Sequence, residues 1–176
     1  LRWLAARVED LGGTTTRMAL AALPDRAEVV VDAAGLGARR LAHDPTVVPV
    51  RGQVLYVEQV GVDRWWLDGT GPTYVVPRSG DVVVGGTEDR GVWDRSPDPA
   101  VAEDLLARAT RLVPALRGAR VLGHRVGLRP ARPTVRLEEE RTASGTRVVH
   151  CYGHGGSGVT VSWGCAAEVA ALVGDP

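Results

Sequence analysis

The sequence contains no lysine and no phenylalanine, only two cysteines, and no surplus of charge of either sign. All 21 basic residues are arginines, and 21 acidic residues balance them, so net charge gives no reason to expect nucleic acid or an anionic membrane as a partner. No apolar run approaches the roughly 20 residues that a membrane-spanning helix needs. These absences favour a soluble protein, which we expect in the cytoplasm.

The two cysteines, Cys151 and Cys165, are too few for a disulfide framework, and their spacing matches no metal-binding motif. We therefore expect no metal site and two free, buried thiols. The chain starts at Leu1 with neither an initiator methionine nor a signal-peptide pattern. We therefore expect it to begin within a longer protein. Its 176 residues suffice for one domain or parts of two.

The first 50 residues have the pattern of an α/β layer. Residues 1–11 repeat apolar side chains at helical spacing, and residues 29–31 form a short apolar run that predicts a strand buried on both faces. A turn of small residues, 32–37, follows this strand. A helix, a strand and a glycine turn in this order are typical of a nucleotide-binding sheet.

From residue 51 the pattern changes to closely spaced short strands, at 53–57, 74–77 and 82–84, which predict an antiparallel sheet. Asp98 is placed to cap a helix with a buried stripe of Val101, Leu105, Leu106 and Leu112. Further strands are expected at 121–125 and 148–152, and a last helix at 163–173. The expected fold class is α+β (mixed α/β), with domain segments 1–50, 51–145 and 146–176.

Two stretches carry chemistry. Residues 127–133, Gly-Leu-Arg-Pro-Ala-Arg-Pro, hold Arg129 on a backbone stiffened by prolines, which suits a bidentate grip on a carboxylate. Taken alone, the segment also fits a surface loop whose arginines pair with residues 138–140. Residues 152–160 hold four glycines between a strand and a helix, so backbone amides can approach a ligand closely. Within this loop His154 is more simply a hydrogen-bonded residue than a catalytic one.

Several segments in matching order resemble the D-amino-acid oxidase and D-aspartate oxidase family, and the similarity covers almost the whole chain. They are Arg-Gly-Gln (51–53), Tyr-Val-Val-Pro (74–77), Gly-Gly-Thr (85–87), Val-Gly-Leu-Arg-Pro-Ala-Arg-Pro (126–133), Arg-Leu-Glu (136–138) and Tyr-Gly-His-Gly-Gly (152–156). The resemblance implies the C-terminal half of such an enzyme: part of an FAD-binding α/β domain (1–50 and 146–176) and an antiparallel substrate-binding domain (51–145).

The resemblance also implies roles for individual residues. Arg129 would pair with the substrate carboxylate, the Tyr74 hydroxyl would join it, and the Gly156 carbonyl would receive the substrate amine. The positions implied to contact FAD are Ala34, Gly35, Gly155, Gly156, Ser157, Gly158, Val159 and Thr160. The implied reaction is oxidation of a D-amino acid with oxygen, giving a 2-oxo acid, ammonia and hydrogen peroxide. The flavin does the difficult chemistry, so no general base is needed.

The sequence departs from the family in three places. It lacks the Gly-x-Gly-x-x-Gly fingerprint of an N-terminal FAD-binding segment, so such a segment is an expected partner and the chain alone is expected to be inactive. Thr70 stands where some relatives carry a second, lid-forming tyrosine. Leu67 and Glu88 stand where the aspartate-specific branch has arginines, which favours neutral or basic D-amino acids.

Two other functions remain open. One is a different amine-oxidising flavoprotein, similar to glycine or sarcosine oxidase, and the other is a non-catalytic chain that cannot hold FAD by itself. A homodimer also remains open.

Overall fold

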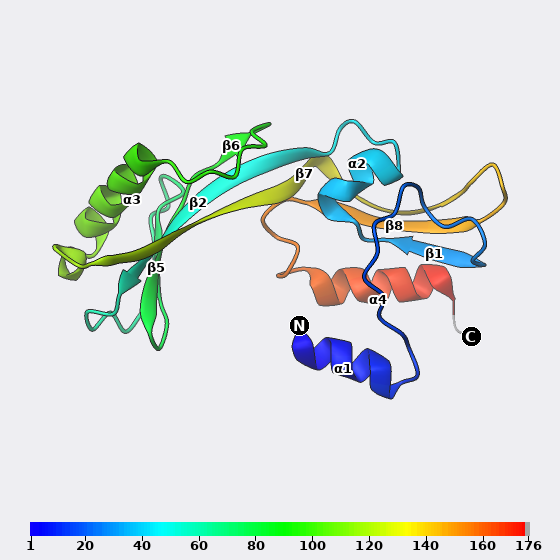
Figure 1. Cartoon of the computed structure of the whole chain (residues 1–176), viewed down its shortest axis with the longest axis horizontal. Helices are drawn as coiled ribbons and strands as arrows, with labels where there is room; N and C mark the ends of the chain where they lie inside the picture. The colour runs from blue at the N-terminus through cyan, green and yellow to red at the C-terminus, as the bar shows by residue number, and fades with distance from the viewer. Residues whose placement is uncertain (175–176) are drawn as a thin grey trace.

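The structure is a computed structural model that describes residues 1–174. It is built on one elongated mixed sheet with the strand order β1-β8-β7-β2-β5-β4-β3, and β6 (Asp89–Arg90) pairs with β2 beside this path. Figure 1 shows two arms, one with α3 (Pro99–Leu112) and the other with α4 (Ser162–Val173). The arms share β7 (Val121–Arg141).

Strand β7 joins the arms because it changes neighbours along its length. Its first part pairs antiparallel with β2 (Val48–Glu58), and its last part pairs antiparallel with β8 (Arg147–His154). Ala131 is the point of exchange, since it pairs with both Val48 and His154. The predicted clamp residue Arg129 lies two residues before this point.

The first arm is an antiparallel sheet that α3 covers on one face. Its strands besides β2 and β7 are β5 (Asp81–Gly85), β4 (Tyr74–Pro77) and β3 (Trp66–Leu67). Asp98 caps α3, as the sequence predicts, because its Oδ1 accepts from the Ala100 amide at 2.8 Å. The core between helix and sheet includes Leu55, Val57, Val75, Val82, Val84, Leu105, Ala109 and Leu116. Every second residue of each strand therefore points away from α3, onto the open face of the arm.

The second arm has the parallel pair that an α/β layer requires. Strand β1 (Val29–Asp32) runs parallel to β8, and a short turn (η1, Gly35–Gly37) and α2 (Ala38–Leu41) follow β1. Tyr152 of β8 is almost fully buried against Ala38 and Val47. Helix α4 follows β8 after the glycine loop.

Most predicted elements are confirmed within a few residues, and α1 (Arg2–Asp10) forms where helical spacing indicates. Helix α1 buries no residue, and Figure 1 shows it apart from the sheet. No helix in the described part of the chain has the length and apolarity needed to cross a membrane.

Three details differ from expectation. The strand expected at 121–125 continues to Arg141, because β2 and then β8 supply partners along its whole length. The buried stripe of α3 is Ala102, Leu105 and Ala109, while Val101, Leu106 and Leu112 only flank it. Val31, expected to be buried on both sides, is 45% exposed, because β1 is an edge strand and Val31 lines an open cavity between the sheet and α4. The three domain segments stay a prediction.

Candidate functional site

Arg129 extends its guanidinium across the open face of the first arm. Gly52 lies on that face, and its missing side chain makes the room, since a Cβ there would meet Arg129 Nη2 at 2.6 Å and Cζ at 2.7 Å. Arg129 Nη1 donates to the Thr87 carbonyl at 3.0 Å. The side chain is only partly buried, so part of the guanidinium remains available to a ligand.

The carboxylates of residues 138–140, which the sequence offers as partners of Arg129, are bound to other arginines. Arg136 pairs with Glu138 at 2.7 Å and with Glu140 at 2.6 Å, and Arg147 pairs with Glu139 at 2.8 Å. Within residues 1–174, Arg129 forms no ion pair. The interpretation of 127–133 as a surface loop with arginines paired to 138–140 is therefore wrong, because the segment lies in β7 and those carboxylates have other partners.

Tyr74 lies on the same open face as Arg129, but on β4, so that β2 and β5 lie between the two strands. It is opposite Gly85 in the β4–β5 pair, and its ring covers the Gly85–Gly86 backbone, where a Cβ on Gly85 would meet the Tyr74 ring at 2.5 Å. Thr87, whose carbonyl holds Arg129, is the next residue after Gly86. Tyr74 and Arg129 thus approach the segment 85–87 from its two ends.

The glycine loop is fastened directly to the Arg129 segment. The Gly155 amide donates to the Pro130 carbonyl at 2.7 Å. Gly153 and Gly155 have φ of 88° and 56°, a conformation that favours glycine. A Cβ on Gly156 would meet Arg129 Cδ at 3.4 Å, so the predicted amine acceptor and the predicted carboxylate anchor are neighbours.

Two clefts meet at Arg129. One, of about 410 Å³, is lined by twelve residues: Ala33, Gly35, Leu128, Arg129, Pro130, Cys151, Tyr152, His154, Gly155, Gly156, Gly158 and Val159. The other, of about 350 Å³, follows the open face along Gly52, Val54, Tyr56 and residues 125–129. The first cleft joins five of the predicted cofactor contacts. Ala34, Ser157 and Thr160 are chain neighbours of lining residues but line neither cleft. Tyr74 also lines neither cleft, and its sheet partner Gly85 pairs with the lining residue Val54.

A buried pair holds the small-residue turn at the end of β1. Asp32 accepts from the Ala34 amide at 3.1 Å through Oδ1, and its Oδ2 lies 3.2 Å from His150 Nδ1. Both side chains are fully buried. Since His150 belongs to β8, this contact fixes the turn against the strand that leads into the glycine loop.

A second buried network holds Tyr152, the residue at the start of the glycine-rich stretch 152–160. Asp44 accepts from Arg132 Nε at 2.6 Å and from the Tyr152 hydroxyl at 3.1 Å. Burial opposes the charge on Asp44, but hydrogen bonds from Thr46, Arg132 and Tyr152 outweigh it and lower its pKa to about 2. Burial raises the pKa of Tyr152, and Asp44 adds to this while Arg136 opposes it. Tyr152 therefore remains a neutral donor.

Sequence reasoning missed the residues that make space for the clamp. From the sequence alone, Gly52 and Gly85 are only parts of the segments 51–53 and 85–87. The signal was available, because a glycine inside a strand often marks a place where another group approaches closely. The glycine alone does not identify the approaching group, because that depends on how the strands pair.

A glycine loop between a strand and a helix, next to a parallel strand pair, is typical of α/β proteins that bind a dinucleotide cofactor. Here the loop is joined to a substrate-sized cleft with an unpaired arginine. Comparison with known families agrees: the family described as FAD dependent oxidoreductase matches residues 2–172. The chain belongs to this family.

Proteins similar to this chain include several oxidases. A D-amino-acid oxidase from Rubrobacter xylanophilus is 54% identical over 99% of this chain and 55% of its own length. A D-aspartate oxidase from Homo sapiens is 45% identical over 99% of this chain and 53% of its own length. The crystal structure of glycine oxidase from Geobacillus kaustophilus superimposes with a TM-score of 0.74, at 30% identity, over 84% of this chain and 41% of its own. The chain thus spans about half the length of the relatives it matches.

Proposed function

We propose that this chain supplies the substrate anchor and part of the cofactor site of an FAD-dependent D-amino-acid oxidase. One observation carries the proposal: Arg129, with no carboxylate partner among the described residues, stands where the two clefts meet and next to Gly156. An arginine left without a counter-charge on a rigid strand is suited to bind a ligand carboxylate by two parallel hydrogen bonds.

The residues present fit one side of a flavin site. Four of the residues that line the cleft of about 410 Å³ are glycines of the β1 turn and the glycine loop, so a flat ring can approach the backbone of both. Gly35, Gly155, Gly156, Gly158 and Val159 would contact the cofactor there, with Ala34, Ser157 and Thr160 beside them. When bound, FAD would supply the two-electron acceptor, with oxygen as final oxidant and hydrogen peroxide as product.

The chain's own contribution to catalysis would be positioning. Arg129 and the Tyr74 hydroxyl would hold the substrate carboxylate, and the Gly156 carbonyl would accept a hydrogen bond from its amine. Fixing two substituents of the α-carbon leaves two arrangements of the hydrogen and the side chain. The walls of the cleft would then select the D enantiomer. Such orientation lowers the barrier without any proton transfer by a protein group.

The open face also favours a class of side chain. Leu67 lies opposite Tyr74 in the β3–β4 pair, so the two share a face of the sheet, and Leu67 offers apolar surface there. This supports neutral D-amino acids as substrates. Arg132, a candidate for binding a second carboxylate, is already paired with Asp44.

The chain would need a companion segment to be active, as its coverage of about half of each relative supports. A glycine-oxidase-like activity is the second candidate, supported by the 30% identical structure.

Co-production of this chain with the N-terminal portion of the 54% identical relative tests these proposals. The complex should be yellow and should produce peroxide with D-alanine but not with L-alanine, and glycine and sarcosine should be weak substrates. A yellow complex that oxidises sarcosine better than D-alanine would favour the second candidate. A colourless complex would mean that the residues named above do not complete a flavin site. This chain alone should bind little FAD.

A further inference from the structure

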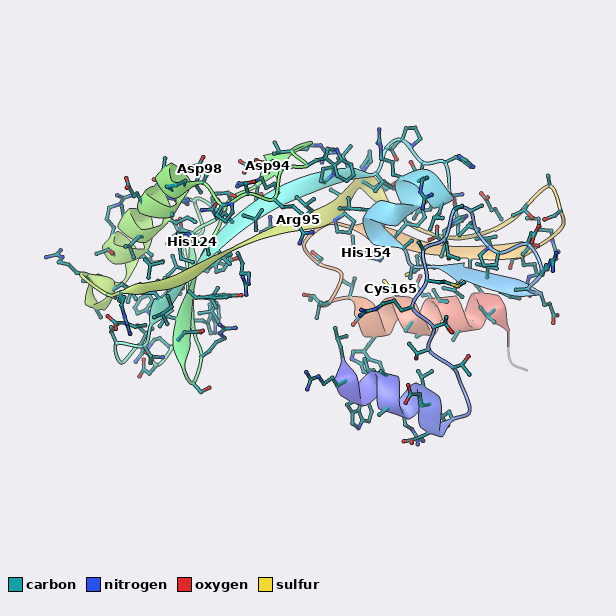
Figure 2. All side chains as sticks on the ribbon, in the orientation of Figure 1. Asp94, Arg95, Asp98, His124, His154 and Cys165 are labelled. Carbon is teal, nitrogen blue, oxygen red and sulfur yellow. The ribbon has the colours of Figure 1, made fainter. Side chains whose placement is uncertain are left out.

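Two thiols and one imidazole meet beside the glycine loop, although the spacing of Cys151 and Cys165 in the sequence matches no metal-binding motif. Cys151 and His154 belong to β8, and Cys165 lies in the first turn of α4. Their ligand atoms all lie within 4.8 Å of one another. Figure 2 places His154 and Cys165 next to each other between the sheet and α4. We propose that these three residues form a binding site for a thiophilic metal ion such as Zn²⁺.

The distances suit tetrahedral coordination. With Zn–N of about 2.0–2.1 Å and Zn–S of about 2.3 Å, a tetrahedral ion separates a nitrogen and a sulfur ligand by about 3.6 Å, and two sulfurs by about 3.8 Å. Cys165 Sγ and His154 Nε2 are 3.4 Å apart. The Cys151 Sγ lies within 4.8 Å of both of these atoms. Small side-chain rotations would bring all three atoms onto one ion.

The surroundings suit the charge of such a complex. The three residues line a cavity of about 350 Å³ whose other walls include Val31, Ala33, Ala166 and Val169. Two thiolates and one divalent ion form a neutral unit, so an apolar wall costs it little. The cavity leaves space for a water molecule as the fourth ligand, as in zinc sites with three protein ligands.

An ion at this position would also link two elements of the fold, β8 and α4. His154 is the last residue of β8 and opens the glycine loop, and Cys165 is three residues into α4. An ion bound to both would hold the two ends of the 155–161 segment at a fixed separation. Cys151 and His154 also line the cleft proposed for the flavin, but the inference does not depend on FAD or on a D-amino acid, and its tests use the chain without either.

Titration of the reduced 176-residue chain with Co²⁺ tests the site, because a thiolate ligand gives cobalt an intense charge-transfer absorbance that water or a carboxylate does not. One equivalent should produce this band, and Zn²⁺ should abolish it by displacement. Zn²⁺ should also raise the midpoint of thermal unfolding of the chain. A reduced chain that is folded by circular dichroism but gives no band would overturn the proposal.

Single substitutions assign the ligands. Cys151→Ser and Cys165→Ser should each weaken Co²⁺ binding by more than about tenfold and diminish the band, and His154→Gln should weaken binding by about tenfold or more. His124→Gln is the matched control, since His124 is exposed on the other arm (Figure 2), and it should bind as the parent does. Unchanged affinity in a folded Cys151→Ser, Cys165→Ser double variant would place the ion elsewhere and sink the assignment. If a cysteine variant unfolds, the two histidine variants still test the site. Zn²⁺ should raise the midpoint of thermal unfolding of His124→Gln more than that of His154→Gln, and equal increases would overturn the proposal.

Discussion

The guanidinium of Arg129 lies against the backbone of Gly52 on the neighbouring strand, so closely that a side chain at position 52 would overlap it. Gly52 is directly opposite Gly127 in the β2–β7 pair, and Arg129 is two residues further along the same face. The arginine can therefore reach Thr87, on the far side of β2, only by crossing a strand that has no side chain at this point. A glycine on one strand thus decides where the clamp on another can lie.

Gly52→Ala should displace the clamp without altering any group that contacts substrate. The added methyl would meet the guanidinium well inside van der Waals contact, so Arg129 must leave the Thr87 carbonyl. Loss of a correctly placed charge-assisted bond is worth about 1.5–3 kcal/mol, so kcat/KM for D-alanine should fall about 10- to 100-fold in the flavin-loaded complex. Gly123→Ala on β7 is the control, since open space surrounds its Cβ position, and its kcat/KM should stay near the parent's. Equal loss in both variants would mean that strand damage, and not the clamp, explains the result.

Arg129→Ala should reduce kcat/KM by orders of magnitude while flavin absorbance remains, because it removes the only cation that the two clefts share. Arg129→Lys should recover little, since an ammonium cannot make two parallel bonds. Steady-state peroxide assays measure both variants. Arg120→Ala removes an exposed arginine of the same arm and should be neutral. Near-parent turnover of Arg129→Ala with D-alanine would show that the carboxylate is held elsewhere.

Tyr74→Phe should act in the same direction more weakly, because it deletes one neutral donor worth about 1 kcal/mol and leaves the ring over Gly85 and Gly86. A loss of roughly fivefold in kcat/KM is expected. Gly85→Ala should be more damaging than Tyr74→Phe, since a Cβ there overlaps the ring itself. The opposite order in a peroxide assay would mean that the position of the Tyr74 ring is unimportant.

The elements of the fold could be predicted from the sequence because each carries a local signal. Asp98 and Pro99 mark the start of α3, and short apolar runs mark β1, β4 and β5. The length of β7 carries no such signal. It depends on two different partner strands that reach Ala131 from opposite sides, a relationship that only the folded sheet defines.

The site was predictable to a similar extent. Arg129 and the glycine loop stand out as residue types in a pattern, and the resemblance to a family gave them roles. The meeting of Cys151, His154 and Cys165 could not be read from the sequence, because it arises from α4 returning over β8. Gly52 is unremarkable until the register places Arg129 beside it.

The buried network around Asp44 makes the free energy of unfolding depend on pH. The pKa of Asp44 is lowered to about 2 in the folded chain from 3.8, so its contribution is fully present above about pH 4 and is lost as the pH falls toward 2. The amount at stake is on the order of 2 kcal/mol. Asp44→Asn should lower the free energy of unfolding at pH 7 and flatten its decline between pH 4 and 2, as measured by urea denaturation. Asp63→Asn, an exposed carboxylate, should change neither value. If the free energy of unfolding of Asp44→Asn fell between pH 4 and 2 as steeply as that of the parent, other carboxylates would be responsible for the decline.

Substrate preference should follow the charge of the open face. Leu67 shares this face with Tyr74, and an acidic substrate would have to bring a second carboxylate against it. An unpaired carboxylate in a closed site costs several kcal/mol, so D-aspartate and D-glutamate should be poorer than D-alanine by about a hundredfold in kcat/KM. A panel of D-amino acids on the flavin-loaded complex measures this. Glu88→Arg and Leu67→Arg should each raise kcat/KM for D-aspartate while lowering it for D-arginine.

One cation on this face could reverse the expectation. Arg125 shares a cross-strand row with Val54, Gly85 and Tyr74, and its guanidinium lies 5.9 Å from the centre of the Tyr56 ring. Its attraction to the ring competes with any ligand, because a substrate carboxylate would have to draw it away from Tyr56. We therefore expect Arg125→Gln to leave the ratio of D-alanine to D-aspartate activity almost unchanged. If D-aspartate were the best substrate of the parent and Arg125→Gln removed that preference, Arg125 would be the side-chain anchor and the apolar-pocket interpretation of Leu67 would be wrong. Arg90 would be next to substitute if Arg125→Gln had no effect on such a preference.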